Sequence, residues 1–453
     1  MKKILSLFLI TVLLTGCMPT RPVNDAPTLQ DFLLEEAVYP EMAPYPNEMN
    51  FVDPKTGIFD DEGFSVVYDA WRSNRDLRKD IPEGYADSLS YYFQSAIPVF
   101  LSDTEGNAVC SPLNVYMALT LLAECTDGES RQQIMNLVDC ADMDALRLQA
   151  GQVWKAHYCA DGASACTLAN SLWLDSGLTY NPDTISRLAK DHYASVFQCT
   201  LGSQDADRAL RDWLNQQTDG LLEEQASGLS LDPDTVLALA STIYYRAKWH
   251  SEFSPERNTD EIFHTPGGDV TTAFMNKQLT YGPYYWGDDF GAVSLSLEDG
   301  SKMWLILPDE GLTPADLLAS RNAAKLALGG WLETGAQKSL RVNLSLPKFD
   351  VGSDLHLEEA LQSLGITAVF DPEDADFSPI LPEQAAWLDA VNHAARVKID
   401  EEGVEAAAYT VMMAAGAAMP PEDEMDFILD RPFLFFITSR DNLPLFAGIV
   451  NDP

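Results

Sequence analysis

The segment Asp400-Glu401-Glu402-Gly403-Val404-Glu405-Ala406-Ala407-Ala408-Tyr409-Thr410 continues without further charge as far as Pro420-Pro421. Its alanine content is typical of a helix or a linker. Read at the two-residue period of a strand, one face carries only small or apolar side chains: Val404, Ala406, Ala408, Thr410, Met412 and Ala414. The segment could therefore also serve as a strand that fills a narrow slot.

The composition around this segment restricts the class of protein. The chain has 453 residues, and its 69 acidic against 29 basic residues give a net charge of −40. Such a chain is repelled by phosphate backbones and by anionic lipid headgroups, so we expect no nucleic-acid partner and no basic membrane-docking patch. With 46% hydrophobic residues it has ample material for a core.

The N-terminus has the pattern of an export signal. Lys2 and Lys3 precede an apolar run that is too short to cross a bilayer, so residues 1–16 are interpreted as a signal peptide. The next residues, Leu14-Thr15-Gly16-Cys17, resemble the lipobox of bacterial lipoproteins. The resemblance implies lipidation of Cys17 and a bacterial protein that is exported and anchored at the cell surface, or extracellular if the anchor is shed. An ordinary signal peptide with a chance cysteine is the alternative.

Residues 17–85 are acidic and interrupted by prolines, which predicts a tether between the membrane and the body. The folded domain is expected over residues 86–453. Within it, Ser111-Pro112 has the form of a helix start, and Leu340 to Leu346 alternates like a half-buried strand. Helical and strand patterns intermingle along the chain, which predicts an α+β fold with a large mixed β-sheet.

The cysteines suggest neither a disulfide framework nor a metal site. Cys159 and Cys166 flank a turn signal and could form a disulfide, whereas the others are as well explained as buried thiols. No CxxC or HExxH spacing occurs, so no metal or cofactor is predicted.

Four further blocks complete the pattern. They are Asn107-Ala108-Val109-Cys110-Ser111-Pro112, Ile243-Tyr244-Tyr245-Arg246-Ala247-Lys248-Trp249, Leu346-Pro347-Lys348-Phe349, and Pro432-Phe433-Leu434-Phe435 with Pro444-Leu445-Phe446-Ala447-Gly448. With the segment 401–421 they resemble, in the correct order, the serpins, a family of loop-inserting protease inhibitors. The resemblance covers about Ala86 to Pro453. It implies a serpin-like fold with further sheets, about eight to nine helices and an exposed reactive loop at about 401–421.

The resemblance also implies an inhibitor that acts as a suicide substrate. A target serine protease, and in some cases a cysteine protease, attacks the loop and becomes esterified to it. The cut loop then inserts as an extra strand and traps the covalent acyl complex. The protein itself would be a monomer, not an enzyme.

The resemblance assigns three groups of residues. The loop hinge is Glu401, Gly403, Val404, Glu405, Ala406, Ala407 and Ala408. The residues at the start of insertion, the breach, are Trp249, Lys348 and Glu401. The sheet-opening cluster is Ser111, Asn114, Ser241 and His393, in which Asn114 stands where a serine is usual and Ser241 where an asparagine is usual. We interpret this as an exchange of amide and hydroxyl within one hydrogen-bond cluster, with two independent changes as the alternative.

Counting sixteen residues from Glu401, as in the family, predicts the reactive bond Ala417-Ala418. Counting back from Pro432 would place the bond later unless Asp423 to Asp426 contains an insertion. The hinge-to-bond length is fixed by strand geometry, so the first count is preferred. The small residues around the bond favour elastase-like or subtilisin-like proteases.

Two other functions compete with inhibition. A hydrolase would need a nucleophile motif such as GxSxG and a partnered histidine, and neither pattern occurs. A serpin fold used without inhibition, as a surface-displayed binding or structural protein, is the stronger alternative. Its hinge would usually carry a charge, a proline or bulky residues on the inward face, which this hinge does not.

Overall fold

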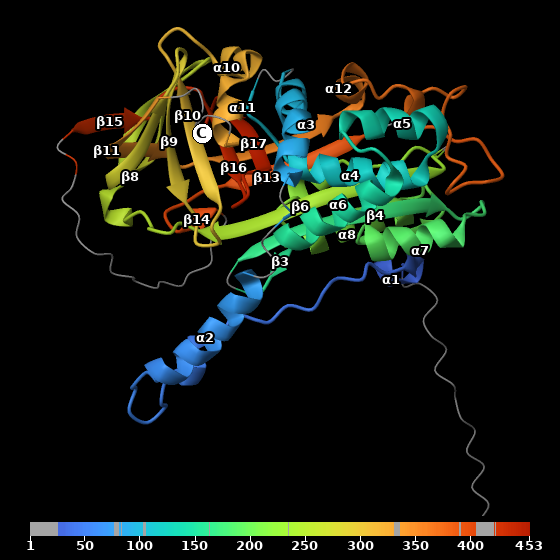
Figure 1. Ribbon diagram of the computed structural model, residues 1–453, viewed down its shortest axis with the longest axis horizontal. Helices are drawn as coiled ribbons and strands as arrows, with labels where there is room; N and C mark the ends of the chain where they lie inside the picture. The colour runs from blue at the N-terminus through green and yellow to red at the C-terminus, as the bar shows by residue number, and fades with distance from the viewer. Residues whose placement is uncertain are drawn as a thin grey trace, which may run out of the picture.

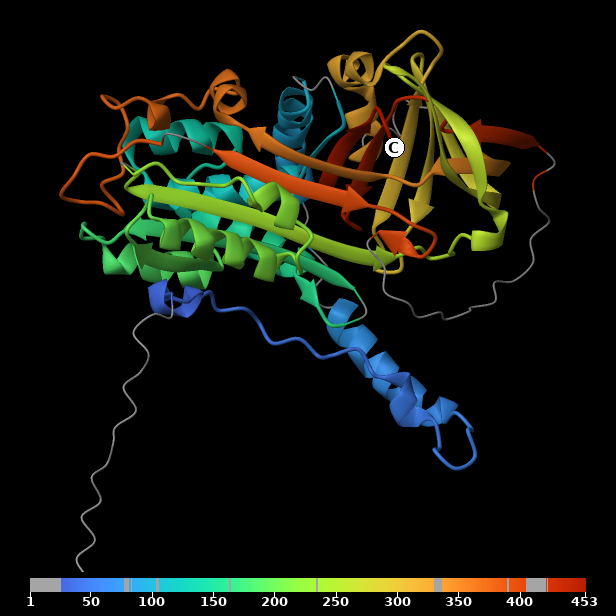
Figure 2. The ribbon, with the colours of Figure 1, turned by 180° about the vertical axis from the view of Figure 1, so that it is seen from behind.

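The computed structural model describes residues 26–76, 81–82, 84–102, 106–162, 164–233, 235–329, 336–388, 391–404, 421 and 423–453. Most helices lie around the first of two large sheets, whose long strand β6 (Leu237–Lys248) passes between α4 (Pro112–Cys125) and α8 (Gln204–Gln217) (Figures 1 and 2). The α+β class predicted from the sequence is confirmed. Within the described residues no helix has both the length and the apolar character needed to cross a bilayer.

The helices are more numerous than the eight to nine expected. Twelve α-helices occur in the described residues, and the excess consists of helices of four to seven residues that are too short to show a periodic pattern. They are α1 (Leu29–Phe32), α2 (Asp61–Asp76), α3 (Tyr85–Phe100), α4 (Pro112–Cys125), α5 (Gly128–Leu137), α6 (Met143–His157), α7 (Pro182–Asp191), α8 (Gln204–Gln217), α9 (Glu223–Ala226), α10 (Pro314–Ser320), α11 (Asn322–Ala327) and α12 (Glu358–Ser363), with 3₁₀ turns η1 (Glu48–Phe51), η2 (Pro255–Arg257) and η4 (Ala368–Phe370).

The strands form three sheets. A six-stranded sheet has the order β1-β5-β4-β6-β14 with β3 on β4; a nine-stranded sheet has the order β15-β11-β8-β9-β10-β16-β17-β2 with β7 on β8; and β12 pairs with β13 alone. Besides β6, the strands are β1 (Leu33–Glu35), β2 (Ala108–Cys110), β3 (Cys159–Ala160), β4 (Ala165–Asp175), β5 (Ala194–Cys199), β7 (Thr259–Thr265), β8 (Gly268–Trp286), β9 (Phe290–Ser296), β10 (Lys302–Pro308), β11 (Ala336–Pro347), β12 (Asp350–His356), β13 (Asn392–Lys398), β14 (Gly403–Val404), β15 (Glu424–Ile428), β16 (Phe433–Thr438) and β17 (Pro444–Val450). Parallel pairing of β4 with β5 and antiparallel pairing of β4 with β6 make the first sheet mixed, as expected.

Local signals in the sequence place several of these elements. The Ser111 hydroxyl accepts a hydrogen bond from the backbone N–H of Asn114 at 3.2 Å and caps α4, whose first residue is Pro112. In β11 the predicted apolar residues Leu340, Val342, Leu344 and Leu346 are buried, but Ser345 on the opposite face is buried as well.

Two apolar clusters hold the layers together. The larger joins α3, α4 and the two large sheets, and the smaller lies where Trp173 and Phe197 of the first sheet meet α8. Part of β6 is therefore covered on both faces, with Leu239 against the larger cluster and Ala238 and Ala240 against the smaller one.

The segment predicted as a tether differs in the structure, because part of it lies on the domain. Leu33 pairs with Phe197 and adds β1 to the edge of the first sheet, and Tyr39 stacks on Trp154. After this extended run, α2 projects away from the body (Figures 1 and 2). Prolines break helices but not an extended chain along a sheet edge, so the composition could not reveal the docking.

All six described cysteines are free thiols. Cys159 and Cys166 lie directly opposite each other on β3 and β4, but they form no disulfide. Burial raises the pKa of the Cys159 thiol to about 11.

Candidate functional site

The loop hinge enters the gap between two strands that belong to different sheets. Gly403 pairs with Lys248 and Val404 with Ala247, so β14 runs antiparallel to the C-terminal end of β6. On the other side, Val404 forms an antiparallel bridge with Ile399, next to β13. The hinge therefore lies between β6 and β13, and these two strands run parallel to each other. Figure 2 shows them side by side.

The turn before β14 is fixed by the Asp400 carboxylate. It accepts hydrogen bonds from the backbone N–H groups of Glu402 at 2.9 Å and Gly403 at 3.2 Å. The indole N–H of Trp249 donates to the Asp400 carbonyl at 2.8 Å, and its backbone N–H donates to the Glu402 carbonyl at 2.9 Å. The turn and the end of β6 are thus one hydrogen-bonded unit.

Two of the breach residues, Lys348 and Glu401, are in direct contact, and Trp249 is bonded to the turn that carries Glu401. Lys348 Nζ lies 2.6 Å from Glu401 Oε1, and the Asn258 side chain also donates to this carboxylate. Burial opposes ionisation of Glu401, but the hydrogen bonds from Lys348, its own backbone and Asn258 outweigh it, so the pKa of the carboxyl is lowered from its usual value. The base of the loop is held by a charged and hydrogen-bonded carboxylate.

The sheet-opening cluster is also brought together, further along β6. The Ser241 hydroxyl lies 2.8 Å from Asn114 Oδ1 and 2.7 Å from Asn170 Oδ1. The backbone N–H of Ser111 donates to His393 Nε2 at 2.9 Å. Because Nε2 accepts, the ring proton is on Nδ1, and burial lowers the pKa of His393 to about 4. The histidine is therefore neutral at physiological pH.

The amide orientation of Asn114 follows from proton counting. One hydroxyl proton cannot serve both asparagine oxygens near Ser241, and within the described residues the buried Asn114 Nδ2 has no hydrogen-bond partner. Exchanging the amide oxygen and nitrogen of Asn114 lets Nδ2 donate to Ser241 Oγ while Ser241 donates to Asn170. Asn114 and Ser241 are thus in direct contact, which the proposed exchange of residue types requires.

A cavity of about 40 Å³ adjoins this cluster beneath the gap. Ser241, Asn392 and His393 form its polar edge. The remaining walls are apolar side chains, among them Leu119 and Leu122 of α4 and Leu239 of β6. The space between the strands is therefore incompletely filled.

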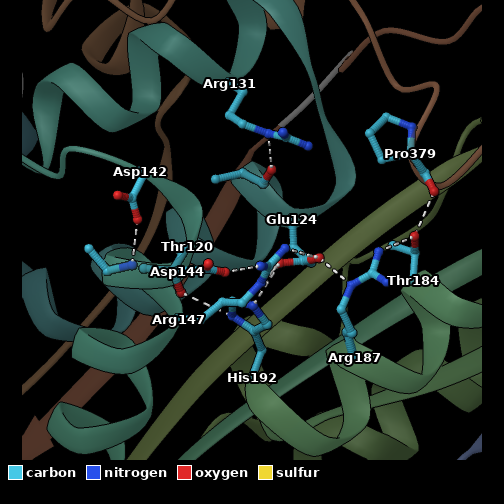
Figure 3. A network of polar contacts seen from close by, with 12 residues as sticks. Thr120, Glu124, Arg131, Asp142, Asp144, Arg147, Thr184, Arg187, His192 and Pro379 are labelled. Carbon is cyan, nitrogen blue, oxygen red and sulfur yellow. Dashed lines mark hydrogen bonds and ion pairs between the residues drawn. The ribbon is translucent and has the colours of Figure 1, made fainter.

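The opposite end of α4 is held by a buried ionic cluster (Figure 3). Glu124 is paired with Arg147 of α6 at 2.8 Å and with Arg187 of α7 at 2.6 Å, and His192 Nε2 lies 3.5 Å away. Burial opposes ionisation of the carboxyl, but its interactions with the nearby His192 and the two arginines dominate and lower its pKa. The cluster fixes the helix whose N-terminal residues enter the sheet-opening cluster.

Several predicted site residues lie outside the residues that the structure describes. They are Cys17, Glu405, Ala406, Ala407, Ala408, Ala417 and Ala418.

Sequence reasoning missed Asn258, Asn170 and Glu124. Asn170 interrupts an apolar strand and Glu124 ends an apolar helix, and a polar group in such a run signals a buried partner. Asn258 lies in an ordinary polar loop and gave no comparable signal.

Comparison with known proteins supplies the remaining evidence. The model of the family described as serpin (serine protease inhibitor) matches residues 98–453. This chain belongs to the serpin family. Serpins are generally protease inhibitors rather than enzymes, and the predicted fold is confirmed.

Individual serpins are similar along most of the chain. Serpin-Z1C of Triticum aestivum is 30% identical over 371 residues, which cover 77% of this chain and 90% of the relative. The leukocyte elastase inhibitor of Sus scrofa is 27% identical and covers 78% and 94%. The solved structure of the thermophilic serpin tengpin in its native state has a TM-score of 0.72 at 24% identity, covering 83% of this serpin and 96% of tengpin.

The N-terminus matches a second model, the prokaryotic membrane lipoprotein lipid attachment site, over residues 1–17. This serpin is therefore an exported lipoprotein anchored in a membrane.

Proposed function

We propose that this serpin inhibits serine proteases as a suicide substrate, through cleavage of its loop and insertion of the cut strand between β6 and β13. The observation that carries the proposal is the position of Gly403 and Val404. They already pair with β6 at one end of the gap, while the described parts of β6 and β13 remain in separate sheets. The first step of an inserted strand is thus present in the uncut protein.

The pairing of Gly403 and Val404 defines which residues of β6 and β13 each later loop residue would face. Extending the pairs Gly403–Lys248 and Val404–Ala247 would bring Thr410 opposite Ser241. Extending the bridge Val404–Ile399 on the other side would bring the same residue opposite His393. Thr410 would therefore lie between Ser241 and His393, two members of the sheet-opening cluster on opposite walls of the gap.

The inward face of such a strand suits the gap. Paired residues point to the same face of a sheet, and both Ala247 and Val404 are buried against the main core. Ala406, Ala408, Thr410, Met412 and Ala414 would follow on this face, and Ala414 would reach Leu237, the first residue of β6. The side chains near Thr410 would also fill the cavity, which by cavity energetics is worth about 1 kcal/mol.

The chemistry uses the protease's own catalytic groups. Its serine hydroxyl would add to the carbonyl of Ala417, the proton would pass to the leaving amine of Ala418, and an ester would join the two proteins. Insertion would then remove Ala417 from the position where water completes hydrolysis. With small residues on both sides of the bond, elastase-like or subtilisin-like proteases are the expected targets, and Ala417→Arg should redirect inhibition toward trypsin-like enzymes.

Denaturing electrophoresis after mixing with an elastase-like protease tests the proposal. We expect a covalent band, a released C-terminal fragment that begins at Ala418 by mass spectrometry, and a higher melting temperature for the cleaved protein. Clean cleavage without a covalent band would instead indicate the non-inhibitory alternative, and a different new N-terminus would overturn the assignment of the bond.

A further inference from the structure

The N-terminal segment attaches to one particular end of the first sheet. Arg208 of α8 donates a hydrogen bond to the Pro27 carbonyl at 3.3 Å, and Leu29, Phe32 and Leu33 pack against the smaller apolar cluster. The chain is therefore fixed to the domain from Pro27 onward.

The stretch of chain between this attachment and the lipid, residues 18–26, is short. Only the nine residues 18–26 separate Pro27 from Cys17, the last residue of the lipid attachment site. Fully extended, the ten Cα–Cα steps from Cys17 to Pro27 span at most about 36 Å. The anchor thus holds the domain close to the bilayer, although the sequence predicted a long tether.

The pairing register identifies the end that is held. Leu33 is opposite Phe197, Phe197 is opposite Trp173, and Trp173 is opposite Ala238 near the start of β6. The hinge pairs with Lys248 at the other end of the same strand. Ten residues of strand, about 33 Å, separate these two ends. Figure 1 shows α1 beside α7 at one end and β14 at the other.

We propose that the end of the domain formed by α1, α7 and α8, here called the anchored end, faces the bilayer. The helices of this end are less acidic than the chain as a whole. Together α1, α7 and α8 carry six acidic and four basic residues, whereas the whole chain has more than twice as many acidic as basic residues.

The orientation has a consequence for inhibition, and this consequence rests on the proposed function. An inserted strand would run from Lys248 toward Leu237, so a trapped protease would be carried from the free end of the molecule to the anchored end. A globular protease of about 230 residues is about 45 Å across. This diameter exceeds the extended length of residues 18–26, so the bilayer would obstruct the final position of the protease. Incomplete insertion would then favour deacylation on the membrane.

The orientation is tested without any protease. In a Cys140→Ser, Cys159→Ser background, a fluorophore is placed on an engineered cysteine at exposed Gln204 of the anchored end or at exposed Ser251 beyond β6. The lipidated protein is bound to vesicles that carry an acceptor on their headgroups. We expect about twofold more efficient energy transfer from Gln204, because β6 alone spans about 33 Å. Equal transfer, or more from Ser251, would overturn the orientation.

The predicted loss of trapping on membranes is tested by changing the length of residues 18–26. Deleting residues 21–25 should lower the covalent fraction on vesicles, and inserting twenty Gly and Ser residues after Asn24 should raise it toward the value of the soluble Cys17→Ser protein. The same length variants in the Cys17→Ser background should all trap equally. Length-independent trapping on vesicles would refute the consequence, whereas absence of trapping in the soluble protein would refute the proposed function instead.

Discussion

Gly403 packs directly on the backbone of Ala247. A Cβ at Gly403 would lie 2.3 Å from the Ala247 carbonyl oxygen and 2.7 Å from Lys248 Cα, and neither backbone atom can move as a flexible side chain can. Only glycine permits β14 to approach β6 this closely.

Gly403→Ala should therefore displace the hinge from β6. We expect slower insertion, a smaller covalent fraction and more cleaved, uncomplexed protein in the electrophoretic assay. Gly228→Ala is the matched control, because a Cβ there meets nothing within 4 Å. An unchanged covalent fraction in Gly403→Ala would show that this contact does not limit insertion.

Removal of the Lys348 ammonium should weaken the breach. Lys348→Met leaves the partly buried Glu401 carboxylate with Asn258 as its side-chain donor, and for a pair of this exposure we expect a loss of about 1 kcal/mol in the free energy of unfolding. The comparison is Lys338→Met, which breaks the more exposed pair with Asp423 and should cost less. Urea titration of both variants measures the difference, and equal losses would contradict a special role for Lys348.

Glu405 should stabilise the cleaved form electrostatically. The register of β14 would place this residue opposite Arg246 on one side and Lys398 on the other, so insertion would bring one carboxylate between two cations. Glu405→Gln should leave the melting temperature of the uncut protein unchanged and reduce the rise in melting temperature on cleavage, by an amount that shrinks at high salt. An undiminished rise would argue against this register.

The sheet-opening cluster should lose stability in acid. Burial lowers the pKa of His393 from 6.5 to about 4, so protonation favours the unfolded chain. The contribution of this group is complete above pH 6.5 and is lost as the pH falls toward 4, by about 3 kcal/mol in total. In His393→Gln, whose amide oxygen can still accept from Ser111, this component should vanish. The measurement is the difference between the two pH profiles of unfolding, which cancels the carboxylates that both proteins share, and coincident profiles would refute the assignment.

The contact between Asn114 and Ser241 predicts strong coupling between these positions. Asn114→Ser alone should destabilise the protein more than Asn114→Ser combined with Ser241→Asn, because the double variant restores one amide and one hydroxyl to the cluster. Additive losses in the double-mutant cycle would support two independent changes instead.

Local residue patterns were sufficient for much of the fold and for part of the site. Ser111 and Pro112 start α4 because capping depends only on neighbouring residues, and the alternation from Leu340 to Leu346 shows which face of β11 is buried. The hinge could be read in the same way. Its small inward residues follow a period of two, and Val404, the residue of this face that the structure describes, is buried, as is the neighbouring Gly403.

Contacts between distant segments were decided only by the tertiary structure. Asn170 reaches Ser241 because β4 and β6 are aligned in one register, and the loop residue Asn258 reaches Glu401 because two distant loops meet in the folded molecule. Register depends on which faces and edges meet in the folded molecule, and a local pattern does not contain this information. For the same reason the docking of Leu33 on Phe197 escaped prediction, although it determines which end of this serpin the lipid anchor holds.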